Sequence, residues 1–187
     1  MRLLPLICCC LLIALPAVAS ITETVSYKHY SAEQQPGMSL LQALDRATPI
    51  REGGKVFHAY TAWNIQWRYR WNQEPNGRCT LTQNSSTLTA LITLPQLKVA
   101  EPKVSLEFSR YIEPLQRHEQ GHVDLARAAA QKIDAGIMAL PSMDSCALLE
   151  QSANRLGQQL VEQARQSGRD YDLKTEHGRT QGAWLPR

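Results

Sequence analysis

The segment Thr61-Ala62-Trp63-Asn64-Ile65-Gln66-Trp67-Arg68-Tyr69-Arg70-Trp71 has the clearest alternation of residue types in the chain. From Trp63 to Trp71, every second side chain is aromatic or apolar, and the residues between them are polar. A period of two places the two sets on opposite faces of a β-strand, so we predict a long antiparallel strand with one buried and one solvated face. The tryptophans favour a core between a sheet and a helix, and a stacking platform for a glycan is the alternative.

The sequence on both sides of this segment predicts further strands and a first helix. After a turn at Asn76-Gly77, residues Cys79 to Leu94 alternate again, which predicts a returning strand or pair of strands. Upstream, Thr22 to Tyr30 predicts a short strand, and Ser39 is the expected N-cap of a short helix that ends at Ala47. We expect these strands to form an antiparallel sheet.

After Pro102 the apolar residues follow spacings of three and four, which predicts helices. The first helix has an apolar face that runs from Leu115 to Ile133. Pro114 either begins this helix or kinks a longer one that starts near Ser105.

A second helix is predicted from the N-cap Asp144 to Gly168, and a polar tail follows. The fold class predicted from these patterns is α+β, with an antiparallel sheet in the N-terminal half packed against two long C-terminal helices. The expected organisation is a single domain at 20–187, divided into a mainly β part at 20–100, a helical part at 101–168 and a tail at 169–187 that returns to the metal site predicted below.

The first nineteen residues, Met1 to Ala19, have the pattern of a secretory signal peptide. Arg2 is followed by an apolar run that ends at Leu15, and Ala17-Val18-Ala19 is typical of a cleavage site. The run is too short for a permanent membrane anchor. We therefore expect an exported protein, periplasmic or extracellular, without a stable membrane anchor after cleavage.

The small net charge of the chain argues against a nucleic-acid partner. The chain of 187 residues has a net charge of +3, and the expected mature part has +2 because Arg2 is removed. Such a small excess with mixed signs gives no field that would attract nucleic acid, so we expect no nucleic-acid partner. No pattern indicates an oligomeric state.

Only two of the five cysteines, Cys79 and Cys146, lie outside the predicted signal peptide. An even pair in an exported chain predicts a disulfide, which would tie the predicted hairpin to the start of the second helix. The alternative role, a thiolate metal ligand, requires another ligand at zinc-binding spacing, and the sequence has none near either cysteine.

The strongest chemical signal is His118-Glu119-Gln120-Gly121-His122, an H-E-x-x-H pattern inside the first long helix. Four residues of helix place His118 and His122 on one face, one turn apart, where both imidazoles can bind one Zn²⁺ ion. Glu119 points about 100° away and is placed to act as general base toward a zinc-activated water. The alternative is an exposed helix whose histidines only cover a surface.

A catalytic zinc also requires a third protein ligand and one open position. The candidates are His177 first, then Glu162, Asp172 and Glu150. Gly178 would let the backbone after His177 turn sharply and approach the site, and a metal bond would hold a polar tail that otherwise frays. A solvated tail histidine is the alternative for His177.

Three stretches together resemble one family. They are the H-E-x-x-H segment with Val123-Asp124, the tail Tyr171-Asp172-x-x-Thr175-x-His177-Gly178-x-x-Gln181-Gly182, and Trp63-x-x-x-Trp67-x-Tyr69 with Cys79. The chain thereby resembles the secreted bacterial family of predicted zinc-dependent proteases known as domain of unknown function 922. The resemblance implies a zincin-like peptidase with zinc on His118 and His122, Glu119 as base, and a further ligand from the segment with His177.

Two tail residues and one strand residue have possible supporting roles. Tyr171 or Tyr69 could donate a hydrogen bond to the oxyanion formed when water attacks a peptide carbonyl, and we favour Tyr171 because it lies near His177 in the sequence. A half-buried structural tyrosine is the alternative for both. Asp172 could also orient a ligand imidazole by a hydrogen bond.

These observations predict a secreted zinc-dependent peptidase that acts on a peptide or protein substrate. Two alternatives from other classes stay open at this point. The first is a non-catalytic envelope module with a closed four-ligand zinc site, and the second is a zinc amidase that acts on cell-wall linkages.

Overall fold

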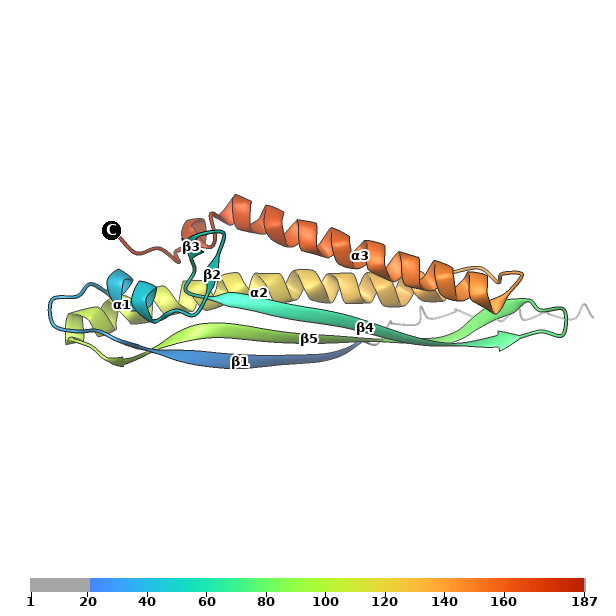
Figure 1. Cartoon of the computed structure of the whole chain (residues 1–187), viewed down its shortest axis with the longest axis horizontal. Coiled ribbons are helices and arrows are strands. Elements are labelled where there is room, and N and C mark those ends of the chain that lie inside the picture. Colours follow the sequence, from blue (N-terminus) through green and yellow to red (C-terminus); the bar gives the residue numbers. More distant parts are fainter. Residues whose placement is uncertain (1–20, 187) are drawn as a thin grey trace, which may run out of the picture.

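The structure is a computed structural model that describes residues 21–186, so the predicted signal peptide lies outside the described residues. A three-stranded sheet lies under two long helices in an elongated arrangement (Figure 1). The elements, in chain order, are β1 (Thr22–Glu33), α1 (Leu40–Ala47), β2 (Arg51–Glu52), β3 (Lys55–Val56), β4 (Tyr60–Gln73), β5 (Cys79–Val99), α2 (Pro102–Met138), α3 (Cys146–Thr175) and the short 3₁₀ helix η1 (Arg179–Gln181).

The main sheet is mixed, and the prediction of an antiparallel sheet is correct only for β4 and β5. The strand order is β1-β5-β4, with β4 antiparallel and β1 parallel to the central strand β5. The chain reverses once between β1 and β4, through α1 and the β2–β3 hairpin, and again at the β4–β5 turn. Alternation of residue types shows which face of a strand is buried, but it does not show the direction of the neighbouring strand.

β5 is longer than predicted because it continues through Pro95 to Val99. Proline has no N–H group and is normally found where a strand lacks a neighbour on one side. The pairing of β4 with β5 ends at Tyr60 and Thr93, so Pro95 pairs only with Tyr30 of β1. The missing N–H group therefore costs no bond between β5 and β4.

The predicted faces of β4 are those of the structure from Thr61 to Tyr69, but Trp71, predicted on the buried face, is exposed because a register shift follows Arg70. Trp63 and Trp67 pack against the core, while Asn64, Gln66, Arg68 and Arg70 are exposed. The Trp67 indole donates a hydrogen bond of 3.1 Å to Asn154 on α3. A side chain at Gly157 would collide with the same indole ring, so this glycine lets α3 approach β4 closely. These contacts favour a core role for the two tryptophans.

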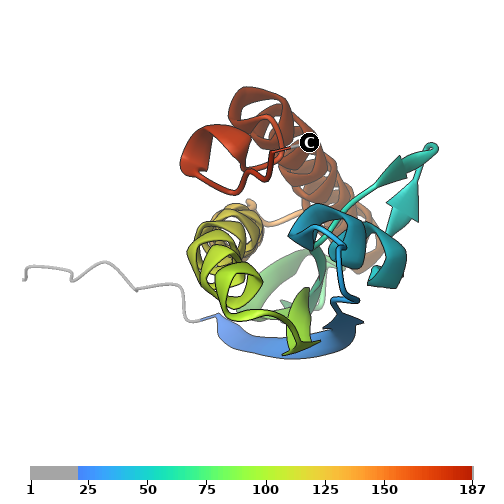
Figure 2. The same ribbon diagram turned by 90° about the vertical axis from the view of Figure 1, so that its left-hand side faces the viewer.

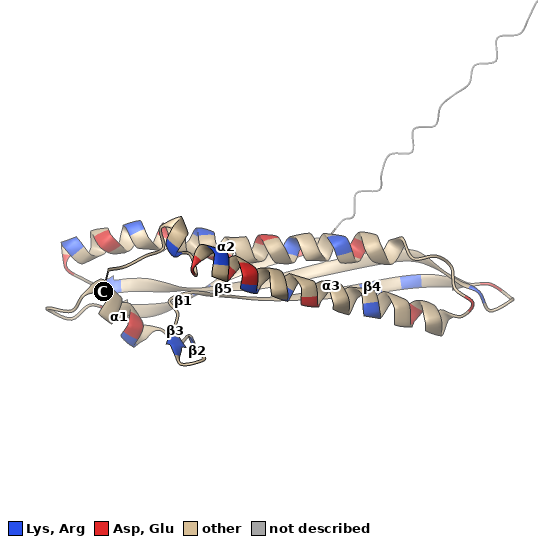
Figure 3. Ribbon diagram, turned by 90° about the horizontal axis from the view of Figure 1, so that it is seen from above, with Lys and Arg blue, Asp and Glu red and all other residues tan. Residues whose placement is uncertain are grey.

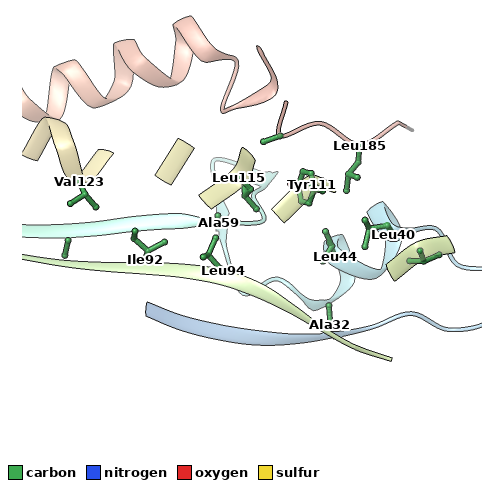
Figure 4. Packing of buried hydrophobic residues seen from close by; sticks show 13 residues of the cluster. Ala32, Leu40, Leu44, Ala59, Ile92, Leu94, Tyr111, Leu115, Val123 and Leu185 are labelled. Atoms are coloured by element: carbon green, nitrogen blue, oxygen red, sulfur yellow. The ribbon is translucent and has the colours of Figure 1, made fainter. Parts of the chain in front are cut away.

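Helix α1 has the predicted N-cap. The Ser39 hydroxyl accepts a hydrogen bond from the Gln42 backbone, and the Gln42 side chain accepts one from the Ser39 backbone. This reciprocal pair is a capping box. The buried face of α1, with Leu40 and Leu44, packs in one hydrophobic cluster with Leu185 of the tail (Figure 4).

Both long helices differ at their ends from the predicted ranges. Helix α2 begins at Pro102 and includes Pro114 in its interior, which decides between the two predicted alternatives in favour of the longer helix. Helix α3 has Ser145, not Asp144, as its N-cap, and it continues through Gly168 to Thr175. Gly168 therefore lies inside α3 and does not end it, and a Cβ atom there would lie 3.6 Å from Nδ1 of His122 on α2, an ordinary contact distance.

The predicted disulfide is present in the structure. Cys79 at the start of β5 is bonded to Cys146 at the start of α3, with 5.0 Å between their Cα atoms. Backbone hydrogen bonds between Cys79 and Met143 reinforce this junction. The end of the β-hairpin is thus fixed to the connection between α2 and α3.

Charged residues of both signs are interspersed along α2 and α3 (Figure 3). Within residues 21–186, none of the helices has the length and apolar character needed to cross a membrane. One ion pair joins the sheet to α2: the Arg127 guanidinium binds both carboxylate oxygens of Glu23, at 2.6 and 2.7 Å. The hydrogen bonds from Arg127 hold the pKa of Glu23 below its usual value.

The Glu23 ion pair should make stability depend on pH. A depressed folded-state pKa stabilises the protein above the unfolded-state value of about 4.3, and this contribution is lost as the pH falls through the folded-state pKa. We expect Glu23→Gln to lower the free energy of unfolding by about 1 kcal/mol at pH 7 and to have almost no effect near pH 2. Urea denaturation at both pH values measures this. The matched control, Glu33→Gln, changes an exposed glutamate of β1, and an equal effect of both variants at pH 7 would contradict the assignment.

Candidate metal centre

The H-E-x-x-H residues lie in the middle of α2, on the side that faces β4 and the end of α3. Viewed along its long axis, the molecule has α2 between the sheet and the end of α3 with η1 (Figure 2). His118 and Glu119 are almost fully buried, with exposed fractions of 3% and 4%, and His122 is partly buried. The alternative of histidines that cover an exposed helix surface does not fit this burial.

Asp172, in the last turn of α3, brings a carboxylate to both imidazoles. Its Oδ1 atom lies 3.1 Å from Nε2 of His118 and 3.0 Å from Nε2 of His122. The three potential ligand atoms lie within 4.8 Å of one another. Asp172 can be there because α3 continues past Gly168, so the carboxylate is placed by a helix and not by an irregular tail. His118, His122 and Asp172 could therefore hold a metal ion.

The hydrogen bonds of His118 fix which ring nitrogen faces Asp172. Nδ1 lies 2.9 Å from Oε1 of Gln181, and the amide nitrogen of Gln181 donates to the Tyr171 hydroxyl. Because Oε1 can only accept, the proton of a neutral His118 is on Nδ1, and the lone pair of Nε2 faces the Asp172 carboxylate. Two acceptors at 3.1 Å require a positive charge between them, either a proton or a metal ion. A cation-binding site needs lone pairs directed at one point in this way.

The pKa values of Asp172 and His118 are shifted because the carboxylate lies beside the imidazoles. Burial tends to raise the pKa of Asp172, but hydrogen bonds from His118 and His122 outweigh it and hold this pKa well below the usual value. Burial tends to lower the pKa of His118, and the bonds to Asp172 and Gln181 raise it above the usual value. The site thus favours an anionic carboxylate beside positive charge.

Glu119 is oriented by a residue of the neighbouring strand. The Thr61 hydroxyl on β4 donates a hydrogen bond of 2.7 Å to Oε2 of Glu119. Burial raises the pKa of Glu119, and the bond from Thr61 opposes this rise. A buried carboxylate with a raised pKa is well suited to accept a proton near neutral pH. The sequence pattern placed Thr61 on the strand but gave no signal of this contact.

The backbone after α3 has an unusual conformation. Glu176 and His177 have positive φ angles of 50° and 53°, and Gly178 follows at 85°. Left-handed conformations are costly for residues other than glycine and are often found at functional sites. They bring Gly178 so close to His118 that an added Cβ atom would lie 3.0 Å from Cγ of the imidazole. The segment from Thr175 to Gln181 therefore packs directly on one potential metal ligand, as the predicted return of the tail requires.

His177 itself lies at the edge of the cluster. Its Nδ1 atom is 3.6 Å from Oδ1 of Asp172, and its side chain is 46% exposed. Its ring contacts Phe57, with 5.1 Å between the centroids. The group of converging ligand atoms therefore contains Asp172, which contacts both imidazoles, and does not contain His177.

The other candidate residues lie elsewhere. Glu162 is exposed on α3 and forms ion pairs with Arg165 and Arg169. Glu150 is exposed in the first turns of α3, where its carbonyl oxygen accepts a long hydrogen bond from Tyr69.

Tyr171 lies behind His118. Its ring stacks on the imidazole, with 4.9 Å between the centroids and an interplanar angle of 9°. Its hydroxyl donates to the His118 carbonyl at 3.3 Å. An aromatic ring in this position restricts the rotation of His118.

An open cleft of about 760 Å³ exposes the site to solvent. One wall is formed by the β2–β3 hairpin and the start of β4, and the other by the end of α3 and the tail. His118, Glu119, His122 and Asp172 all line this cleft. A ligand can therefore reach the candidate metal centre and the neighbouring carboxylate together.

Comparisons with known proteins place the chain in one family. No curated protein and no solved structure matches the sequence. The family model described as "Bacterial protein of unknown function (DUF922)" matches residues 27–178, which include most of β1, all of β4, β5, α2 and α3, and the three potential metal ligands. Because this match covers most of the chain, the protein belongs to the DUF922 family of bacterial proteins.

Proposed function

We propose that this protein is a zinc-dependent peptidase with His118, His122 and Asp172 as metal ligands and Glu119 as general base. One observation carries the proposal: two imidazole Nε2 atoms and a carboxylate oxygen converge in the wall of an open cleft, beside a buried glutamate. The family assignment is compatible with this activity and does not specify it.

The donor set fits zinc. Two imidazoles and one carboxylate are a ligand combination that zinc accepts, and three protein ligands leave the open position typical of catalytic sites. Bound zinc would supply Lewis-acid polarisation of a carbonyl oxygen and would lower the pKa of a water molecule. A closed structural site would require a fourth protein ligand, and within residues 21–186 the group of converging ligands has three members.

The residues of the chain have separate roles in this proposal. Gln181 accepts from Nδ1 of His118 and so keeps the Nε2 lone pair directed at the metal position. Thr61 holds the Glu119 carboxylate by a hydrogen bond, which leaves Oε1 for the proton of the attacking water. Glu119 then delivers that proton to the leaving amine, since a base in one step can act as the acid in the next.

The volume of the cleft supports a ligand-binding role. Its volume of about 760 Å³ is within the range of ligand-binding sites, roughly 300 to 1,000 Å³. Residues of β4, α2 and α3 all line it, so a peptide bound there would contact the candidate metal centre. Export through the predicted signal peptide would allow the Cys79–Cys146 disulfide to form, because exported compartments are oxidising.

Metal removal and restoration test this function. We expect the purified mature protein to hydrolyse casein or mixed peptides, to lose activity after dialysis against a chelator, and to recover it on addition of one equivalent of Zn²⁺. Hydrolysis of peptidoglycan fragments but not of casein would replace the peptidase by a cell-wall amidase. If zinc binds and neither substrate is cleaved, the proposed catalytic role is wrong.

A further inference from the structure

Three arginines line the α3 side of the cleft. Arg165 and Arg169 are on α3, and Arg179 begins η1. Their side chains are more than half exposed, so their guanidinium groups are hydrated and accessible. None of these residues belongs to the candidate metal centre.

The position of two of these arginines relative to Asp172 follows from helix geometry. Arg169 precedes Asp172 by three residues and Arg165 precedes it by seven, which correspond to about 4.5 and 10.5 Å along the helix axis. Both residues point within about 60° of the direction of Asp172 around the helix. The two guanidinium groups therefore follow the same side of α3 that carries the carboxylate of the metal centre.

The present partners of these guanidinium groups are weak. Arg165 lies 3.6 Å from Glu162 and makes no hydrogen bond to any residue in the described part of the chain. Arg169 bonds to Glu162 at 3.1 Å and to Gln166. Glu162 is itself exposed and does not line the cleft. Exposed ion pairs contribute little, about 1 kcal/mol at most, so an incoming anion can displace them at low cost.

The surface of α3 beside these arginines is formed by small residues. Ala164 and Gly168, which precede Arg165 and Arg169 in the sequence, also line the cleft. Gly168 has no side chain in front of His122, where an added Cβ atom would lie 3.6 Å from Nδ1. A ligand can therefore extend from the metal centre along α3 to the arginines.

We propose that Arg165 and Arg169 bind a carboxylate of the substrate, one to three residues from the bond that is cleaved. This inference rests on the proposed peptidase function. An extended residue spans about 3.3 to 3.6 Å, so one to three residues cover the axial distances from Asp172 to the two arginines. Guanidinium groups match carboxylates in shape and charge. The carboxylate is either the C-terminal group of a peptide or an acidic side chain.

Peptide binding to zinc-loaded Glu119→Gln protein tests this inference without turnover. Calorimetry would compare three pentapeptides of one neutral sequence: one with a free C-terminal carboxylate, one amidated, and one amidated with a single glutamate. We expect at least one carboxylate peptide to bind about tenfold more tightly than the neutral amide. If the peptide with the free C-terminus binds more tightly, the carboxylate is the C-terminal group; if the glutamate peptide does, it is an acidic side chain. Adding Arg165→Gln with Arg169→Gln should remove that gain, whereas Arg155→Gln, an exposed change elsewhere on α3, should not.

Two results would overturn the inference alone: equal affinity for the amide and both carboxylate peptides, or a gain that persists in the double arginine variant. No binding of any peptide would overturn the inference and the proposed function together. Zinc content and circular dichroism of the double variant show whether its fold and metal centre are intact. Failure of the proposed function has a different signature, because zinc-loaded wild-type protein would then bind the same peptides and leave them uncleaved.

Discussion

Replacement of Glu119 by glutamine should leave zinc bound and reduce peptide hydrolysis by about 10²- to 10⁴-fold. Glutamine has the size of glutamate, and its side-chain oxygen can still accept the hydrogen bond from Thr61. It cannot take a proton from water. The loss should therefore be in kcat, measured with a peptide substrate at saturating zinc, while metal analysis shows an unchanged zinc content.

The matched control for this substitution is Glu113→Gln. Glu113 is an exposed residue of the same helix and forms an ion pair with Arg117 one turn away. This variant should retain wild-type kcat and zinc content. Wild-type hydrolysis by Glu119→Gln protein with full zinc would show that Glu119 is not the base.

Removal of the disulfide has the largest expected effect on stability. The bond closes a loop of 67 residues, and the loop-entropy model gives a contribution of about 4 kcal/mol for a loop of this length. The effect should be large here because the bond fixes the end of the hairpin to the start of α3, the helix that carries Asp172. We expect the Cys79→Ala, Cys146→Ala double variant to show this loss in urea denaturation.

Reducing agent supplies the control for the disulfide. Dithiothreitol should destabilise the wild-type protein to about the level of the double variant and should leave the double variant unchanged. A double variant as stable as the oxidised wild-type protein would contradict the stabilising role.

Local patterns predicted the parts of the fold that depend on one element at a time. The alternation in β4 gave its buried face, and Ser39 was predicted as the N-cap of α1, although its capping-box partner Gln42 was not. The direction of β1 was not predictable in this way, because it depends on how the chain returns between β1 and β4. Gly168 was interpreted as a helix end, although α3 continues past it to Thr175, because a glycine can end a helix or lie within one and the local sequence does not decide which.

In the candidate site, too, the local features were predictable from the sequence and the features that depend on packing were not. The spacing of His118 and His122 is local, and a helix places both side chains on one face. The third carboxylate was one of several candidates, since its position depends on where α3 ends and how it crosses α2. The contacts from Thr61 and Gln181 were missed, because each joins elements that are far apart in the sequence.

Zinc affinity of single variants tests the proposed metal centre most directly. Competition with a chromogenic chelator would be measured for wild-type protein and for Asp172→Ala, His177→Ala and His122→Ala. The proposed ligand set predicts one tightly bound zinc ion in the wild-type and His177→Ala proteins, and at least about a tenfold loss of affinity in the other two variants. A His177→Ala protein that loses zinc, together with an Asp172→Ala protein that keeps it, would contradict the ligand set.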